Sequence, residues 1–309
     1  MAKAERLFAV MVGIVASLAL SACDGGAQSA QRAPGDKLRV VATTTIIADL
    51  ARQIGGEHVE VTSIMRVGED PHVYEVRPRD AQTIGAADLV LMNGLNLEAT
   101  LEHVAQQYAA SDKLVRLAES PAIEPLGGQH GVGVDPHCWF NVEYIMVYVE
   151  RARDALMAAD PDHAASYHAR ARTYLAELRE LHEWIIRELE TVPREQRVMV
   201  TSHDAFQYYG ARYDIDVHAV VGISTEQQPR PRDKQELERL VRQRHVKALF
   251  IETSVSQALN NIVKDIAART GAQIGGSLYS DSLGSEDSPA GTYIGMVRQN
   301  TATIVAALR

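Results

Sequence analysis

The segment RPRDAQ, residues 77–82, recurs as RPRDKQ, residues 230–235. A proline stands second in both copies, and a helix tolerates proline in its first turn because the missing N–H would have no partner there. Each copy is followed by an apolar run typical of a buried strand, ADLVLM at residues 87–92 and VKALFIE at residues 246–252. The repeated order of helix start and buried strand indicates two copies of one α/β unit.

The elements around the two copies also match in order. Residues 37–44 (KLRVVATT) are predicted as a strand, residues 46–54 as a helix that ends at Gly55-Gly56, and residues 59–65 as a second strand. The corresponding predictions in the second half are a strand at 197–202, a helix at 204–213 and a strand at 217–221. Strands that alternate with helices favour parallel sheets, so we expect an α/β fold of two similar lobes.

A long helical pattern separates the two halves. Its apolar residues recur at three- and four-residue steps: Ala164, Tyr167, Ala171, Tyr174, Leu178, Leu181, Ile185 and Leu189. Asp160 is the expected N-cap, and Pro193 follows the end of the pattern. At about 1.5 Å per residue, about 28 residues extend over roughly 40 Å, which suits a rigid connection between lobes. We expect an N-terminal lobe at 37–159, a linking helix at 160–192 and a C-terminal lobe at 193–309.

The N-terminal segment has the pattern of an export signal. A short basic region precedes the apolar stretch 7–20, which is too short for a membrane span of about 20 residues. Leu20-Ser21-Ala22 then precedes Cys23, as in the bacterial lipobox, where the signal is cut before a cysteine that becomes lipidated. We predict a signal peptide at 1–22, a lipid anchor at Cys23 and a flexible tether at 23–36. An ordinary cleaved signal is the alternative, and both place the protein in the periplasm or at the cell surface.

The composition limits the classes of function. The formal net charge is −9, which argues against nucleic-acid binding and does not oppose a cationic cargo. No segment after the tether reaches the length of a transmembrane helix, so the folded part is expected to be soluble. With Cys23 acylated, Cys138 is the remaining cysteine, and stability has to come from core packing rather than from a disulfide.

Three of the eleven histidines and one aspartate lie in distinctive predicted loops. They are His72 in GEDPHVYE (68–75), His137 in VDPHCW (134–139), His203 in VTSHD (200–204) and Asp281 in LYSDSLG (278–284). Ligands of open α/β sheets bind beyond the carboxyl ends of strands, so two facing lobes could bring these side chains into one cleft. Their spacing matches no short metal motif such as HExxH or CxxC, and residue type alone leaves each histidine more commonly a surface or hydrogen-bonded residue than a ligand.

Taken together, these segments resemble the metal-specific solute-binding proteins of ABC importers, the zinc- and manganese-binding TroA-like and ZnuA-like group. The motifs occur in the family's order over residues 37–309: GEDPHVYEVRPRDA, DPHCWFNV, VTSHDAFQYYGARYDI, GISTEQQPRPRD, VKALFIET and LYSDSLG. The resemblance implies that His72, His137, His203 and Asp281 each supply one ligand to a metal ion. It also implies two α/β lobes joined by one long helix and delivery of the metal to an ABC importer permease, and we expect a monomer.

The identity of His203 bears on the metal. Manganese-preferring members of the family usually have glutamate at this position, and imidazole suits zinc better than manganese. We therefore expect one Zn²⁺ per chain, with Mn²⁺ as the alternative. Because an imidazole must be neutral to bind a metal, affinity should fall as the pH approaches about 6.5 and below. Each ring should donate its other N–H to an acceptor, and the candidates are Asp70, Asp135, Asp204 and Glu252.

Two nearby side chains are candidates for further roles. Many zinc members carry a long histidine-rich loop before the second ligand, whereas residues 124–135 are short and glycine-rich here, with His130 alone. His130 is a candidate accessory ligand, although a solvated loop histidine is the simpler expectation. Cys138 adjoins His137, but adjacent side chains of an extended segment point in opposite directions, so we expect Cys138 and Trp139 to pack in the core.

A carrier is favoured over two other classes of protein. A zinc hydrolase keeps three protein ligands, a water and a nearby base such as Glu75, but Asp281 is expected to close the fourth position. Nothing in the residues marks an adhesive surface, the third class. For the carrier, the long helix should resist a large rotation of the lobes. We therefore predict that the loop 280–291, which contains Asp281, moves on metal release.

Overall fold

The computed structural model describes residues 35–127 and 133–309. The predicted signal, Cys23 and nearly all of the tether lie outside these residues, as does His130. Within the described ranges, none of the helices combines the length and apolar character needed to cross a membrane. Cys138 is the free cysteine of these ranges, and it is buried.

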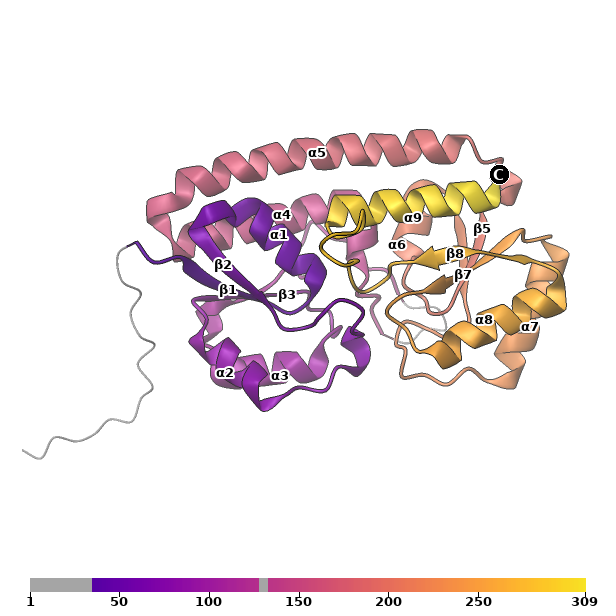
Figure 1. The fold of residues 1–309 in the computed structure, drawn as a ribbon, viewed down its shortest axis with the longest axis horizontal. Helices are drawn as coiled ribbons and strands as arrows, with labels where there is room; N and C mark the ends of the chain where they lie inside the picture. Colours follow the sequence, from indigo (N-terminus) through magenta and orange to yellow (C-terminus); the bar gives the residue numbers. More distant parts are fainter. Residues whose placement is uncertain (1–34, 128–132) are drawn as a thin grey trace, which may run out of the picture. The chain divides into compact units, whose positions relative to one another are not determined.

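The two lobes each contain one parallel four-stranded sheet (Figure 1). The N-terminal sheet has the order β2-β1-β3-β4, with β1 at Leu38–Ala42, β2 at Val59–Ser63, β3 at Leu89–Met92 and β4 at Leu114–Arg116. The C-terminal sheet has the order β6-β5-β7-β8, with β5 at Val198–Thr201, β6 at Asp216–Ala219, β7 at Ala248–Glu252 and β8 at Gln273–Leu278. The second order is the first with every strand shifted by four, so the two lobes repeat one α/β unit as predicted.

Nine α-helices connect and cover the strands of the described ranges. They are α1 (Thr45–Gly55), α2 (Pro78–Ala86), α3 (Ala99–Tyr108), α4 (Val142–Ala159), α5 (Ala164–Glu190), α6 (Gln207–Tyr213), α7 (Pro231–Gln243), α8 (Gln257–Thr270) and α9 (Tyr293–Leu308). The two copies of the repeated segment begin α2 and α7, each with its proline in the first turn. In α2 the buried Asp80 carboxylate also accepts the backbone N–H of Arg77, at 2.8 Å. The predicted helix starts are therefore confirmed.

The long helix α5 has 27 residues, and its predicted apolar positions from Tyr167 to Leu189 are buried, whereas Ala164 at its start is half-buried. Its start differs from the prediction, because a short 3₁₀ turn at Pro161–His163 precedes it and Asp160 does not cap it. The Asp160 carboxylate instead accepts the hydroxyl of Tyr167 at 2.6 Å and pairs with the ring of His163 at 2.8 Å. The α-helix begins at Ala164, and these two contacts of the Asp160 carboxylate are made to side chains.

One continuous apolar core joins the two lobes. It contains Ile47 of α1 and Ile145 of α4 from the N-terminal half, Leu178 of α5, and Tyr209 of α6 and Met296 of α9 from the C-terminal half. Helix α5 passes over both lobes and packs on α4 and α9 (Figure 1). A densely packed interior of this kind resists sliding and rotation of its parts. The shared core therefore favours local movements over a hinge motion of whole lobes.

Each lobe also has a smaller core on the other face of its sheet. Val90 and Leu101 belong to this cluster in the N-terminal lobe, and Leu249 and Val263 belong to it in the C-terminal lobe. Both sheets are thus covered on two faces, as expected for parallel strands. Loops follow the carboxyl ends of the strands, and these loops carry the candidate site.

Candidate metal centre

The four predicted ligands meet in one cluster, with ligand atoms that all lie within 4.8 Å of one another. The Nε2 atom of His137 lies 3.1 Å from Nε2 of His72 and 3.4 Å from Nε2 of His203. The carboxylate of Asp281 lies 3.5 Å from Nε2 of His137 and 3.4 Å from Nε2 of His203. His203 closely follows β5, while His72 and Asp281 lie in the loops after β2 and β8. The tertiary structure therefore brings together side chains that the sequence spaces far apart.

The rings of His137 and His203 are each held by a carboxylate. Asp135 accepts both the backbone N–H of His137, at 2.9 Å, and its ring Nδ1–H, at 2.7 Å. Glu252, the last residue of β7, accepts the backbone N–H of His203 at 2.8 Å and its ring Nδ1–H at 2.6 Å. Because an ionised carboxylate only accepts hydrogen bonds, the Nδ1 atoms carry the hydrogens. Each Nε2 atom then points into the cluster, as metal binding requires.

The other two candidate acceptors have different roles. Asp70 accepts the backbone N–H of His72 at 2.9 Å and caps the short 3₁₀ turn Pro71–Val73 that carries this histidine. Asp204 accepts the side-chain amide of Gln207 at 2.6 Å instead of a histidine ring. Asp135 and Glu252 are therefore the ring partners, and Asp70 positions His72 through its backbone.

Asp281 presents a buried oxygen that lacks a donor. Its Oδ1 accepts no hydrogen bond from the described part of the chain, although the residue is only 2% exposed. The backbone N–H of Asp281 donates to the hydroxyl of Ser254 at 3.1 Å, which fixes the backbone but gives Oδ1 no hydrogen bond. A buried anionic oxygen without a partner costs free energy unless a cation lies beside it. The orphaned oxygen faces the same cluster as the imidazole nitrogens, so it fits a cation.

The electrostatics of the cluster also favour a cation. Burial lowers the pKa of His72 to about 3, so this ring is neutral near pH 7. Burial raises the pKa of Asp281, but the imidazoles of His203 and His137 outweigh it and hold the pKa below its ordinary value. Burial lowers the pKa of His203, but Glu252 and Asp281 outweigh it and raise the pKa well above its ordinary value. A metal ion must therefore displace a proton at His203.

Cys138, Trp139 and Glu75 do not join the four-residue cluster. Cys138 is fully buried, and burial raises the pKa of its thiol to about 12. Trp139 is also buried, lies edge-on to the ring of His137, and donates its indole N–H to the carbonyl of Ser280 at 3.1 Å. Core packing is thus confirmed for both residues. Glu75, the base that a hydrolase would need, is exposed and lies outside the cluster that the described residues form.

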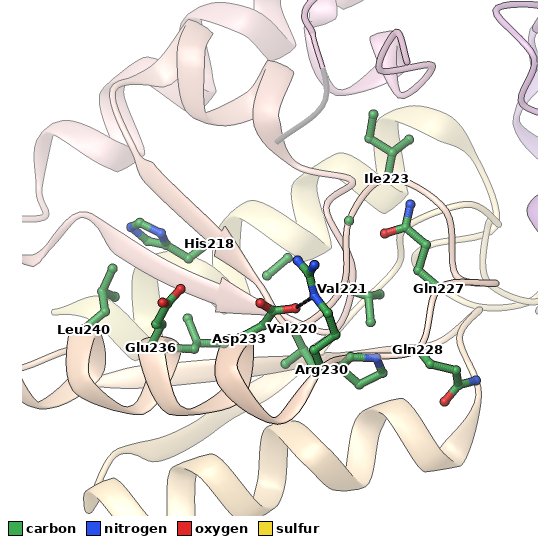
Figure 2. A pocket seen from close by; sticks show the side chains of 14 residues that line it. His218, Val220, Val221, Ile223, Gln227, Gln228, Arg230, Asp233, Glu236 and Leu240 are labelled. Atoms are coloured by element: carbon green, nitrogen blue, oxygen red, sulfur yellow. Dashed lines mark hydrogen bonds and ion pairs between the residues drawn. The ribbon is translucent and has the colours of Figure 1, made fainter. Parts of the chain in front are cut away.

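One cavity borders the candidate site, and a second cavity lies on the C-terminal lobe. A cavity of about 620 Å³ reaches His72 and is lined by residues 95–101 of the N-terminal lobe and by Ile223, Ser224, Glu226 and Gln227 of the C-terminal lobe. A second cavity, of about 580 Å³, lies between β6 and α7, where Arg230 pairs with Asp233 at 2.9 Å (Figure 2). None of the four predicted ligands lines the second cavity. The first is therefore the one that borders the candidate site.

The segment between these cavities was not assigned a role from the sequence. Thr225 donates its hydroxyl hydrogen to Asp70 at 2.6 Å, which links the C-terminal lobe to the turn that carries His72. Ser254, which binds the backbone of Asp281, was also missed. Thr225 lies in one of the quoted motifs, GISTEQQPRPRD, but a hydroxyl in a polar loop has no sequence signal for a partner 155 residues away.

Comparisons with known proteins agree with this geometry. The family model described as the periplasmic zinc-uptake complex component A, ZnuA, matches residues 40–307. The manganese-binding lipoprotein MntA of Bacillus subtilis is 38% identical over 299 residues, which are 96% of this chain and 97% of MntA.

Solved structures of related proteins share the fold. The periplasmic zinc-binding protein TroA of Treponema pallidum superposes with a TM-score of 0.84 at 35% identity, over 88% of this chain and 99% of TroA. A manganese-bound periplasmic metal-binding protein of Candidatus Liberibacter asiaticus superposes with a TM-score of 0.79 at 30% identity, over 88% of this chain and 100% of that one. The match of the family model to nearly all of the described residues, with these relatives, shows that the chain belongs to the ZnuA family of periplasmic metal-binding proteins.

Proposed function

We propose that this protein captures one divalent transition-metal ion outside the cytoplasm and delivers it to the permease of an ABC importer. The ligands are His72, His137, His203 and Asp281. The observation that carries the proposal is the buried Oδ1 of Asp281, which accepts no hydrogen bond from the described residues, beside three converging imidazole nitrogens. Membership of the ZnuA family supports the transport role.

The spacing of the donor atoms supports a small metal ion. Tetrahedral zinc with bonds of about 2.0–2.2 Å separates neighbouring donor atoms by about 3.3–3.6 Å. The four distances given above range from 3.1 to 3.5 Å. Four protein donors would close the tetrahedron, whereas a catalytic zinc keeps a position for water. Closure suits a protein that carries an ion without reacting it.

Zn²⁺ is the proposed cargo, with Mn²⁺ as the alternative. Three imidazoles and one carboxylate favour zinc, because oxygen-rich sites suit manganese better. The relatives' names include both metals, manganese for MntA and zinc for TroA. The ligand set therefore carries the preference for zinc.

Metal content of the purified protein tests the proposal. Metal-free protein is incubated with equal concentrations of Zn²⁺ and Mn²⁺ and separated from free ions. The bound metal is then identified and counted by mass spectrometry. We expect about one zinc ion per chain, lost in His203→Ala and kept in His168→Ala, which removes an exposed histidine of α5. Retention of the ion by His203→Ala would refute the ligand assignment. One manganese ion per chain in place of zinc would overturn the assignment of zinc as the cargo, and the proposed carrier role would stand.

We also propose that the chain is anchored through lipid on Cys23 after removal of residues 1–22, with residues 23–36 as the tether. The residues before Cys23 support this proposal, and MntA is named a lipoprotein. Fractionation of cells that express the full chain tests it. The wild-type protein should sediment with membranes, and Cys23→Ala should move to the soluble fraction. A Cys23→Ala protein that still sediments with membranes would refute the anchor.

A further inference from the structure

The four proposed ligands are not equally accessible. His137 and His203 are fully buried and Asp281 is 2% exposed, whereas His72 is only half-buried. The cavity of about 620 Å³ reaches His72 and none of the other three. Of the four proposed ligands, His72 is therefore the one that this cavity exposes.

One wall of this cavity is a segment with little packing support. We call residues 222–229 the strap. The strap has no helix or strand, and its side chains are half-buried or exposed. Ile223 and Gln227 line the cavity at His72 and also the cavity of the C-terminal lobe, where Figure 2 shows them at the end away from His218 and Leu240. The strap borders both cavities, and its residues belong to none of the three apolar clusters that the described residues form, which is a property of segments that open locally.

Among the described residues, a hydrogen bond to one carboxylate connects the strap to the opposite lobe. The hydroxyl of Thr225 donates to Oδ2 of Asp70 at 2.6 Å, and Oδ1 of Asp70 accepts the backbone N–H of His72 at 2.9 Å. Asp70 is half-buried, and hydrogen bonds to a carboxylate strengthen where solvent is partly excluded. The contact that closes the strap over the cavity is thus made to the turn that carries the most accessible ligand.

The loop 280–291 is held much more firmly at its start. Ser280, Asp281, Ser282 and Leu283 are at most 4% exposed. The hydroxyl of Ser282 accepts the backbone N–H of Gly68 at 2.8 Å, and the backbone N–H of Leu283 donates to the hydroxyl of Thr45 at 2.9 Å. Two contacts with the N-terminal lobe and the burial of residues 280–283 oppose movement at the start of this loop, which contains Asp281 and which the sequence suggested would move.

We propose that the strap is the gate for metal entry and release, and that the Thr225–Asp70 hydrogen bond is its latch. This inference rests on the proposed carrier function. Opening of the strap uncovers His72 while the shared core keeps the lobes in place. Because an ion passes a gate in both directions, the latch slows both association and dissociation of the metal.

The rates of metal exchange test the latch. Thr225→Val removes the hydroxyl at nearly constant volume, and Thr225→Ser keeps it. Zinc dissociation into a chromogenic chelator and zinc association are followed by stopped flow, and zinc per chain is counted in every variant. We expect both rates to rise about tenfold in Thr225→Val, since a hydrogen bond to a charged group has an effect of this order. Both rates should return to their wild-type values in Thr225→Ser. In Thr225→Val the dissociation constant should change by a smaller factor than either rate.

Two variants make the comparison specific. Thr173→Val, an exposed position on α5, is the matched control and should leave both rates unchanged. Ser282→Ala removes the contact of the other loop with Gly68. Faster exchange in Ser282→Ala together with wild-type rates in Thr225→Val would show that the loop 280–291 moves, and the gate proposal would be wrong.

The experiments distinguish a failure of the proposed carrier function from a failure of the proposed gate. A wild-type chain that binds no zinc overturns both. A wild-type chain that binds one zinc, with rates within twofold of those in Thr225→Val, overturns only the gate. Faster dissociation with unchanged association in Thr225→Val also overturns it, because that pattern belongs to a loss of ligand positioning at His72.

Discussion

Glu252 accepts two hydrogen bonds from His203, one from the backbone N–H at 2.8 Å and one from the ring Nδ1–H at 2.6 Å. The two bonds orient the imidazole and place the hydrogen on Nδ1, which leaves Nε2 to face the cluster. Asp135 does the same for His137. One carboxylate in each half of the chain therefore prepares a histidine for the metal.

Replacement of Glu252 by glutamine should weaken metal binding. Glutamine has a similar shape but is uncharged, so it accepts the ring N–H less strongly and no longer sets the imidazole orientation as firmly. We expect affinity for Zn²⁺ to fall about 10- to 100-fold, measured by competition with a zinc chelator. Glu195→Gln, at an exposed position, is the matched control. An unchanged affinity in Glu252→Gln would contradict the assigned role.

Metal binding should stabilise the folded chain. A ligand that binds only the native state at a thousand times its dissociation constant adds about 4 kcal/mol to the free energy of unfolding. Urea unfolding with and without excess zinc should show this gain, and a chelator should reverse it. In Asp281→Ala the gain should largely disappear, because the proposed carboxylate ligand is absent. A full gain in Asp281→Ala would show that the stabilising ion binds elsewhere.

The buried Glu98 should make stability depend on pH. Its Oε1 accepts the hydroxyl of Thr43 at 2.8 Å and the backbone N–H of Asn93 at 2.7 Å, and burial raises its pKa to about 7. The folded state therefore holds a proton that the unfolded state releases near pH 4.5. The stability that this proton contributes is fully present below about pH 4.5 and is lost as the pH rises through 7. The loss in the free energy of unfolding is up to about 3 kcal/mol.

Glu98→Gln isolates that contribution, because glutamine resembles the protonated acid and does not titrate. Urea unfolding of metal-free protein at pH 5 and pH 8 measures it. The wild-type protein should lose more stability than Glu98→Gln between these two values. Equal losses would show that Glu98 does not hold an extra proton in the folded state.

The shared core should make the two lobes unfold together. Leu178 of α5 is fully buried in it, and Leu178→Ala should lower the free energy of unfolding by about 2–5 kcal/mol through the cavity it leaves. We expect a single urea transition when intrinsic fluorescence and far-UV circular dichroism are compared. Arg172→Ala, at an exposed position of the same helix, should change stability little. Two separate transitions in the wild type would contradict a continuous core.

Much of the fold followed from local patterns in the sequence. The repeated proline segments predicted the starts of α2 and α7, and the apolar steps predicted the buried face of α5. The patterns were weaker at β4, which has three residues, and at β8, which contains Gly275-Gly276. They were also insufficient at the start of α5, where side-chain partners of Asp160 replaced the expected cap.

The sequence by itself determined the first three strands of each lobe, the helices between them and α5, because helix and strand periodicity depend on neighbours within a few residues. It also supplied the four candidate ligands, through their resemblance to a known family. Only the tertiary structure decided that Glu252 and Asp135 hold the rings, that Asp204 does not, and that Thr225 reaches Asp70. The contacts of Glu252 with His203 and of Thr225 with Asp70 join residues 49 and 155 positions apart. Such contacts depend on how the lobes pack, which no local pattern encodes.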